Sequence, residues 1–426
     1  MTSHFLVGAA AFGAGIYYAK TYMEKAKSED DKEAPKKEEP LPSRSVPPPY
    51  CCCCLCEVRS HILYIFHVIS DLPNVIKISE FERLRSGVRN WSKWMPDSCA
   101  QQRGRMTDAL VELSPGALIS GRWTVIKKLG AGAFGAVYLC QDQDGITKGA
   151  LKTEPINAPF PLLALEAIVL RSFDTLRASS GKHFCRCMDI GRDQQPDPAS
   201  GRTLEFNFIV MSLVGRPFDK LLQESGDCFS PGTAIGAALQ LLKALQALHD
   251  VGYLHRDIKP ANLAIGLPET NEQRLLYLLD FGMARKYDGT IRRQRTSANF
   301  RGTPIYAPIS AHIKRDYSRG DDIESWFYVL IKFYKGAVPW KFIKDINEIG
   351  QYKCRRLKDE PAKVRKEALE ELTGGCPPEF NKILAHIDGL EPEDRPDYEM
   401  IEKTLRGCLK KLEIREHPYD WEVGRQ

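Results

Sequence analysis

A glycine-rich segment is the first part of this 426-residue sequence whose residue types could do chemistry. Its glycines, Gly130, Gly132 and Gly135, have the spacing G-x-G-x-x-G, and an apolar run over 136–140 follows them. The same spacing occurs in dinucleotide-binding folds, but there a helix begins at the last glycine, whereas a β pattern follows here. Glycines in a hairpin between two strands let backbone N–H groups approach phosphates closely, with Phe134 covering the tip. The sequence therefore predicts a nucleotide lid.

A lysine and a glutamate follow this hairpin at positions that suit phosphate binding. Lys152 ends the next predicted strand, and Glu166 lies within a predicted helix at 162–170. A lone lysine in a strand usually belongs to a solvated face. Together with the lid, however, Lys152 is interpreted as the lysine that contacts the α- and β-phosphates of a nucleotide and is held by Glu166. The alternative for Glu166 is an ordinary surface charge.

A predicted amphipathic helix at 231–250 leads into a loop of polar side chains. The helix is predicted from its apolar residues at helical spacing, namely Ile235, Leu239, Leu242, Leu245 and Leu248. The loop, residues 255–262, reads HRDIKPAN. It resembles the catalytic loop of protein kinases (H-R-D-x-x-x-x-N), and the lysine after the aspartate is typical of serine/threonine rather than tyrosine kinases. Asp257 can accept a substrate hydroxyl proton, Lys259 can neutralise charge on the transferring phosphoryl group, and Asn262 can hold a magnesium ion.

The motif Asp280-Phe281-Gly282 completes this resemblance. It follows a predicted apolar strand at 275–279, and Asp280 matches the second magnesium ligand of the family pattern. A three-letter match is common by chance, but the order and spacing of the lid, the lysine, the glutamate, the loop and this motif are not. Hard oxygen ligands suit magnesium, which bridges phosphate oxygens. The resemblance therefore implies ATP and Mg²⁺ as cofactors.

The second half of the chain resembles the casein kinase 1 superfamily, and most closely its tau-tubulin kinase branch. The segments that carry this resemblance are 118–128, 280–286, 300–303, 306–307, 318–330, 339–340 and 344–345. The resemblance covers roughly 115–410 and implies an α+β fold with two lobes. We expect a small β-rich N-lobe with one helix at 121–213, a large helical C-lobe at 214–413, and a short tail at 414–426.

Three features around the activation segment follow from the same resemblance. Most kinases have Ala-Pro-Glu here and pair the glutamate with a later arginine, but this chain has Ala307-Pro308-Ile309, a loss typical of the superfamily. Thr303 resembles the threonine near the catalytic aspartate that sets the preference for hydroxyl substrates. Asp322 matches the aspartate that braces the catalytic loop. The helix that carries Asp322 is expected to bury the stripe Ile323, Trp326, Phe327 and Leu330.

The resemblance also implies an adenine pocket. Met211 resembles the residue that guards this pocket, and the backbone from Ser212 to Val214 would offer hydrogen bonds to the base. The residues that would sandwich the adenine ring are Leu129, Val137, Ala150 and Ala264.

Substrate recognition is the part of the pattern from which this chain departs. Family members often recognise acidic or phosphorylated substrates through basic residues, and Arg256 and Arg285 match two such positions. The arginine expected two residues after Thr303 is Ile305 here. Because an arginine binds phosphate through two parallel hydrogen bonds, its loss predicts a weaker preference for already phosphorylated sites. The expected partners are proteins with Ser or Thr, including acidic, phosphorylated or cytoskeletal ones.

The first hundred residues differ from the rest. Residues 1–19 carry no formal charge and are marginal in length for a membrane span, so they are either a small-residue helix, an unstructured end or an anchor. Residues 20–105 are predicted to be a linker and irregular head, largely disordered, and Met106 is an alternative start. The cysteines Cys51 to Cys54 with Cys56 lack the paired spacing of a zinc site but suit reversible acylation, a second route to a membrane tether.

Composition limits the remaining classes of function. The chain has 60 Lys+Arg against 55 Asp+Glu, a net charge of +5, which excludes nucleic-acid binding as the main activity. Thirteen cysteines, an odd number without regular spacing, predict reduced thiols in the cytosol or nucleus. The leading hypothesis is an active serine/threonine kinase. Its rival is a pseudokinase-like scaffold, which usually lacks one of the required lysine, aspartate or asparagine residues, whereas this sequence has them all.

Overall fold

The computed structural model describes residues 110–132, 135–158, 162–177, 179–197, 201, 203–287, 300 and 302–423. All of them belong to one compact unit that runs from Thr107 to Gln426. The predictions for residues 1–19, for the head at 20–105 with its cysteine cluster, and for Phe134 lie outside the described residues. Within the described ranges, no helix is both long and apolar enough to cross a membrane.

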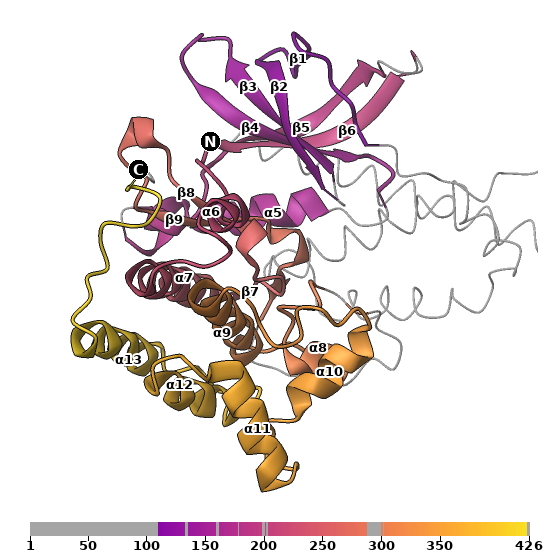
Figure 1. Ribbon diagram of the computed structural model, residues 1–426. Helices are drawn as coiled ribbons and strands as arrows, with labels where there is room; N and C mark the ends of the chain where they lie inside the picture. Colours follow the sequence, from indigo (N-terminus) through magenta and orange to yellow (C-terminus); the bar gives the residue numbers. More distant parts are fainter. Residues whose placement is uncertain are drawn as a thin grey trace, which may run out of the picture. The chain divides into compact units, whose positions relative to one another are not determined.

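The N-terminal lobe is a six-stranded antiparallel sheet (Figure 1). In spatial order its strands are β1 (Leu118–Ile119), β2 (Trp123–Gly132), β3 (Gly135–Asp142), β4 (Lys148–Pro155), β6 (Thr203–Ser212) and β5 (Cys187–Pro196). The predicted hairpin is confirmed, because β2 and β3 pair from Trp123 opposite Asp142 to Gly132 opposite Gly135. One helix, α5 (Leu162–Arg171), packs with this sheet.

The two faces of the sheet have different surroundings. On one face, Tyr138, Leu151 and Phe208 are buried in a small core of their own. The chain before β1 covers this core, since the Tyr138 hydroxyl donates to the carbonyl of Val111 at 2.7 Å and accepts from the N–H of Leu113 at 3.1 Å. The lobe therefore uses residues ahead of the predicted start at 121. The opposite face, which carries Lys152, is the one that turns toward the rest of the molecule.

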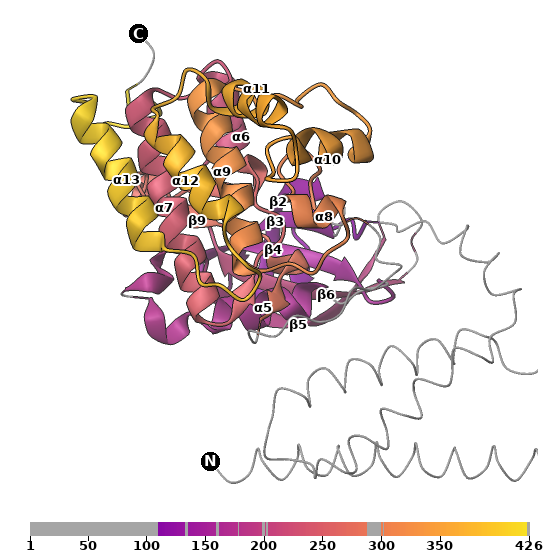
Figure 2. The ribbon, with the colours of Figure 1, turned by 90° about the horizontal axis from the view of Figure 1, so that it is seen from below.

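The C-terminal lobe is helical. Its helices are α6 (Phe218–Glu224), α7 (Pro231–Asp250), α8 (Ile309–His312), α9 (Arg319–Lys335), α10 (Ile346–Cys354), α11 (Ala362–Thr373), α12 (Glu379–Asp388) and α13 (Tyr398–Lys411). Two short two-stranded sheets pair β7 (Tyr253–Leu254) with β10 (Arg285–Lys286), and β8 (Leu263–Ile265) with β9 (Leu276–Leu278). Seen from below, α7, α9, α12 and α13 run roughly side by side (Figure 2). Together the two lobes confirm the predicted α+β architecture, with a small β-rich lobe and a large helical lobe.

The central helices α7 and α9 form where their sequences predict them. Helix α7 begins at Pro231, whose missing N–H suits the first turn, and Ser230 caps it. The predicted apolar stripe of α7 is buried throughout. Helix α9 opens with a capping box between Ser318 and Asp321, and the helix is buried continuously from Asp321 to Ile331. Its predicted stripe of Ile323, Trp326, Phe327 and Leu330 is 0% exposed.

The C-terminal segment after α13 packs against the helical lobe. The Tyr419 side chain is 0% exposed, and its hydroxyl accepts a hydrogen bond from Gln240 on α7. A Cβ on Gly236 would come within 2.8 Å of the Tyr419 ring, so the glycine lets this segment approach α7 closely. Asp420 accepts hydrogen bonds from Ser230 at the start of α7. Figure 1 shows the segment, in yellow, leaving α13 and running back along the helices.

This packing generates a stability prediction. Tyr419→Ala should lower the free energy of unfolding by about 3 kcal/mol or more, because it removes a fully buried aromatic ring and leaves a cavity. Thermal or urea unfolding of the full chain measures this. The control is Val423→Ala, since Val423 is 57% exposed and its loss should change stability by about 0.5 kcal/mol at most. Equal stabilities for the two variants would show that the segment does not pack in solution.

Candidate active site

The glycines of the β2–β3 hairpin have two different environments. Gly135 has a φ of +148°, and a Cβ there would lie 1.8 Å from the carbonyl oxygen of Thr153 on β4, so only glycine fits. A Cβ on Gly130 or Gly132 would meet nothing within 4 Å. Gly135 is therefore needed for β3 to approach the backbone of β4 at Thr153. Gly130 and Gly132, in contrast, leave open space beside their backbone. Such space is what a phosphate group requires to reach backbone N–H groups.

Lys152, Glu166 and Asp280 come together from three separate elements. The Lys152 ammonium on β4 lies 2.7 Å from the Glu166 carboxylate on α5 and 3.0 Å from the Asp280 carboxylate, which follows β9. Glu166 is only 2% exposed, which rules out the alternative of a surface charge. Burial alone would lower the pKa of Lys152, but the two carboxylates outweigh it and raise that pKa above its ordinary value. Lys152 is therefore a cation that links the two lobes.

The environment of Asp280 favours its ionised carboxylate form. Burial acts to raise its pKa, but the Lys152 charge more than offsets burial and lowers the pKa below its ordinary value. Its Oδ1 atom faces both Lys152 and the N–H of Gly282. The backbone of Asp280 is left-handed, with φ of +62°, an uncommon conformation for a residue other than glycine.

The predicted catalytic loop residues form one hydrogen-bonded cluster. Asp257 Oδ1 accepts hydrogen bonds from the N–H of Thr303 at 3.0 Å and from its hydroxyl at 2.9 Å. Asp257 Oδ2 accepts from the Lys259 ammonium at 2.6 Å, and Lys259 also reaches the Thr303 hydroxyl at 3.1 Å. The Asn262 amide nitrogen donates to the Asp257 carbonyl at 2.8 Å. The structure thus brings together all four residues predicted to be catalytic.

Asn262 and Asp280 have the chemistry that a magnesium ion requires. Asn262 uses its amide nitrogen toward Asp257, so its amide oxygen is the atom available to a cation. Asp280 offers a carboxylate that is about one-third exposed at its side chain. Oxygen ligands of this kind fit magnesium, which keeps several waters or phosphate oxygens alongside one or two protein ligands.

A buried carboxylate on α9 holds the backbone of this loop. Asp322 is 0% exposed and accepts hydrogen bonds from the N–H groups of His255 at 2.7 Å and Arg256 at 2.8 Å. Its Oδ2 atom also lies 2.9 Å from Nε2 of His249 on α7. Arg256 has a left-handed backbone, with φ of +69°. The contacts to Asp322 stabilise this strained conformation directly before Asp257, which confirms the predicted brace.

Aromatic packing fixes the position of the motif that contains Asp280. The centroid of the His255 ring lies 5.2 Å from that of the Phe281 ring. The Phe281 centroid lies 5.8 Å from that of Phe184, whose ring stacks on Phe173 with a centroid distance of 3.7 Å. Phe281 is 1% exposed. This row of rings joins the catalytic loop to the segment between α5 and β5, so the Asp280 carboxylate is held by packing as well as by charge.

Three of the residues predicted to line an adenine pocket, namely Val137, Ala150 and Met211, share one face of the sheet. Ala150 pairs with Met211, and Val137 pairs with Lys152, so all four face the same side. Ala264 lies on β8, and the remaining lining residues, Leu129 and Val214, are half-exposed or partly buried. Apolar side chains on the Lys152 face, only partly covered by protein, fit a flat apolar ligand whose phosphates reach Lys152.

Two predicted basic residues are engaged within the protein. The Arg256 guanidinium donates to the carbonyl of Met283 at 2.7 Å. The Arg285 guanidinium lies 3.2 Å from the Asp316 carboxylate and donates to the Tyr317 carbonyl at 2.6 Å. Both contacts orient the guanidinium groups toward the chain's own backbone.

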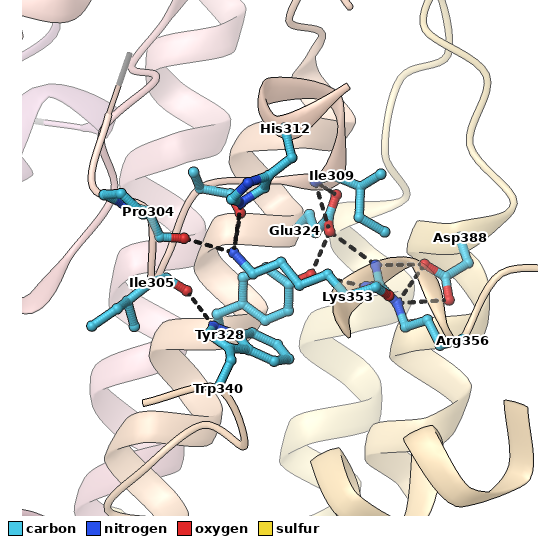
Figure 3. A network of polar contacts seen from close by, with 11 residues as sticks. Pro304, Ile305, Ile309, His312, Glu324, Tyr328, Trp340, Lys353, Arg356 and Asp388 are labelled. Carbon is cyan, nitrogen blue, oxygen red and sulfur yellow. Dashed lines mark hydrogen bonds and ion pairs between the residues drawn. The ribbon is translucent and has the colours of Figure 1, made fainter. Parts of the chain in front are cut away.

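The structure also shows how the chain compensates for the missing motif glutamate. Glu324 on α9 accepts hydrogen bonds from the N–H of Ile309 and from the Arg356 guanidinium, which lies 2.9 Å away. Arg356 also contacts Asp388, at 2.8 Å (Figure 3). Sequence reasoning missed this pairing. A signal for it in the sequence was the position of Glu324 directly after Ile323, within the part of the helix predicted to be buried.

Comparison with known proteins agrees with the family predicted from the motifs. Residues 123–405 match the family model described as the protein kinase domain. The chain belongs to the protein kinase family. The match spans both lobes, from the first residue of β2 into α13.

Two relatives of this protein kinase are serine/threonine kinases by name. A Dictyostelium discoideum protein named as a probable serine/threonine-protein kinase is 36% identical over 318 residues, or 74% of this chain. The chain covers 59% of that relative's length. The serine/threonine-protein kinase spe-6 of Caenorhabditis elegans is 33% identical over 310 residues, covering 71% of this chain and 76% of the relative. These names agree with the class predicted from Lys259.

The Asp322 brace leads to a prediction. Asp322→Asn replaces an acceptor oxygen by an NH₂ group that faces a backbone N–H, so a buried donor loses its partner. Such a loss should lower the free energy of unfolding by about 1–3 kcal/mol. The same variant should reduce kinase activity, because the backbone before Asp257 is released.

The control for this variant is Asp359→Asn, an exposed aspartate on the surface of the same lobe. Thermal unfolding and phosphate transfer are measured on both full-length variants. If Asp322→Asn matched the control in both measurements, the brace would have no part in holding the loop.

Proposed function

We propose that this chain is an active serine/threonine kinase that transfers the γ-phosphoryl group of ATP to hydroxyls of protein substrates. The observation that carries this proposal is the complete cluster of Asp257, Lys259, Asn262 and Thr303. The ion pairs of Lys152 with Glu166 and Asp280 support it, because a lysine held between two carboxylates is positioned to contact phosphates. The alternative is a scaffold with little activity. It is not supported, because the lysine, aspartate and asparagine that such scaffolds usually lack are present here as Lys152, Asp257 and Asn262.

The roles of the protein groups follow from their contacts. Asp257 is positioned to accept the proton of a substrate hydroxyl, and Thr303 orients its Oδ1 atom through two hydrogen bonds. Lys259, at 2.6 Å from the same carboxylate, provides a positive charge where a phosphoryl group would be transferred. Bound Mg²⁺, held by Asn262 and Asp280, would neutralise charge on the phosphates of ATP.

The first test of this function removes the general base. Asp257→Asn should reduce ATP- and Mg²⁺-dependent phosphorylation of casein or tubulin by about a hundredfold or more, because the amide cannot accept the hydroxyl proton. Incorporation of labelled phosphate by the full chain measures this. Asp359→Asn, at an exposed position, is the control and should retain full activity. Equal phosphorylation by Asp257→Asn and the unaltered protein would contradict the proposal.

We further propose that the kinase is of the casein kinase 1 type, similar to the tau-tubulin branch, but that its substrates need no prior phosphorylation. Ile305 supports this, because its side chain packs against the apolar core and offers no charge to a phosphate. The engagement of Arg256 and Arg285 with the protein's own carbonyls and with Asp316 supports it as well. Among the residues that the structure describes, the guanidinium groups of Arg256 and Arg285 are therefore already bound within the protein rather than directed to a substrate phosphate.

The second test restores the missing arginine. Ile305→Arg should raise the ratio of kcat/KM for a phosphorylated casein peptide over its unphosphorylated form by about tenfold, the effect of one charge-assisted hydrogen bond to phosphate. Ile313→Arg, at a 40%-exposed position beyond α8, is the control and should leave the ratio unchanged. A high ratio already present in the unaltered protein would contradict the proposal for unprimed substrates.

A further inference from the structure

The segment directly after Thr303 follows the residue that contacts the proposed general base, Asp257. Thr303 contacts the Asp257 carboxylate through both its N–H and its hydroxyl. If Asp257 accepts the proton of the substrate hydroxyl, as the proposed function requires, the substrate residues next to that hydroxyl lie along 304–307. The conformation of this segment then decides how well a substrate is held.

The backbone carbonyls of this segment are held by two side chains from outside it. The Lys353 ammonium on α10 donates to the carbonyl of Pro304 at 2.8 Å and to that of Ala307 at 2.6 Å. The Trp340 indole N–H donates to the carbonyl of Ile305, between them, at 2.8 Å. Figure 3 shows both side chains reaching toward the segment from the helical lobe.

The Lys353 ammonium has a complete set of partners. Besides the two carbonyls, it lies 3.3 Å from Nε2 of His312 on α8. The other ring nitrogen of His312 lies 3.0 Å from the Ile346 carbonyl and must donate to it, so Nε2 is left as an acceptor. The ammonium also lies 4.8 Å from the Tyr328 ring and 5.0 Å from the Trp340 ring. These contacts use all three N–H donors of a lysine that is 1% exposed.

The nearby carboxylate is committed to other partners. Glu324 accepts from Ile309, Arg356 and the Tyr328 hydroxyl, and among the described residues no carboxylate pairs directly with Lys353. Burial therefore lowers the pKa of Lys353 to about 7, with Glu324 opposing this and Arg356 adding to it. A buried ammonium carries a desolvation cost, which the hydrogen bonds to the two carbonyls and the contacts with the rings offset here. The ammonium is thus committed to holding the segment 304–307.

We propose that Lys353 and Trp340 are positioning residues that hold the backbone of residues 304–307 in the conformation that receives a protein substrate. Their side chains act on the substrate only through this segment. Without the ammonium, the carbonyls of Pro304 and Ala307 lose their partner, and the segment relaxes toward other conformations. Substrate binding then weakens, while the Lys152 site, which belongs to other elements, keeps its geometry.

The test separates the two substrates of the reaction. In the full chain, Lys353→Met should raise the KM for dephosphorylated casein by about tenfold, the effect of losing hydrogen bonds that orient the segment. The KM for ATP should stay unchanged. A variant that is merely destabilised would lower the fraction of active enzyme and hence kcat, without this change in one KM alone.

A matched lysine provides the control. Lys332 on α9 also donates to two backbone carbonyls, those of Asp227 at 3.0 Å and Gly336 at 2.7 Å, and its side chain is 14% exposed. Lys332→Met should leave both KM values unchanged. A folded Lys353→Met with an unchanged KM for casein, or with equal increases in both KM values, would overturn the proposal.

A second variant keeps the test decisive if Lys353→Met does not fold. Trp340→Phe retains an aromatic ring beside the ammonium but removes the N–H that holds Ile305, together with part of the buried ring system. It should raise the KM for casein by about threefold with the KM for ATP unchanged, and no change in either would overturn the proposal. The proposed function fails separately, if the unaltered chain transfers no phosphate at all.

Discussion

The buried carboxylate of Asp322 is the contact on which the geometry of the active site depends. A carboxylate is costly to bury unless its oxygens accept hydrogen bonds, and here both oxygens do so, from the backbone of His255 and Arg256 and from His249. The loop and the carboxylate stabilise each other. The loop satisfies the buried charge, and the charge keeps the loop in a left-handed conformation that a free chain would rarely adopt. The chemistry at Asp257 is in this way tied to the packing of α9.

Helix α9 supports the site at two points through neighbouring carboxylates. Asp322 reaches the loop 255–262, and Glu324, two residues later, reaches Ile309 at the start of α8 and Arg356 after α10. Residues two apart on a helix point in different directions, so one rigid helix can fix two separate pieces of backbone. In place of the glutamate that most kinases have at the position of Ile309, Glu324 on α9 therefore supplies the carboxylate. This carboxylate still pairs with an arginine from a later part of the chain, Arg356.

Much of this architecture could be predicted from the sequence because its signals are periodic or local. The hairpin, α7 and the buried stripe of α9 follow from apolar spacing, and their helix starts carry recognisable caps. The C-terminal segment around Tyr419 could not be predicted in this way. It is too short to show a period, and it is stabilised by Gln240 and the start of α7, which lie far away in sequence. A sequence without repeats or caps is assigned as a tail even where it is part of the core.

The same distinction explains which site residues were found. Asn262 contacts Asp257 five positions away, so the motif itself encodes the contact. Lys353 lies 46 positions from Ala307, and in the sequence it is one of many lysines of the chain, with no motif around it. Only the fold shows that it is buried and that its donors face carbonyls. Local motifs thus identify the groups proposed to perform the reaction, whereas the groups proposed to shape the substrate site act on backbone atoms. Any residue type offers the same carbonyl, so these contacts leave no pattern in the sequence of the segment they hold.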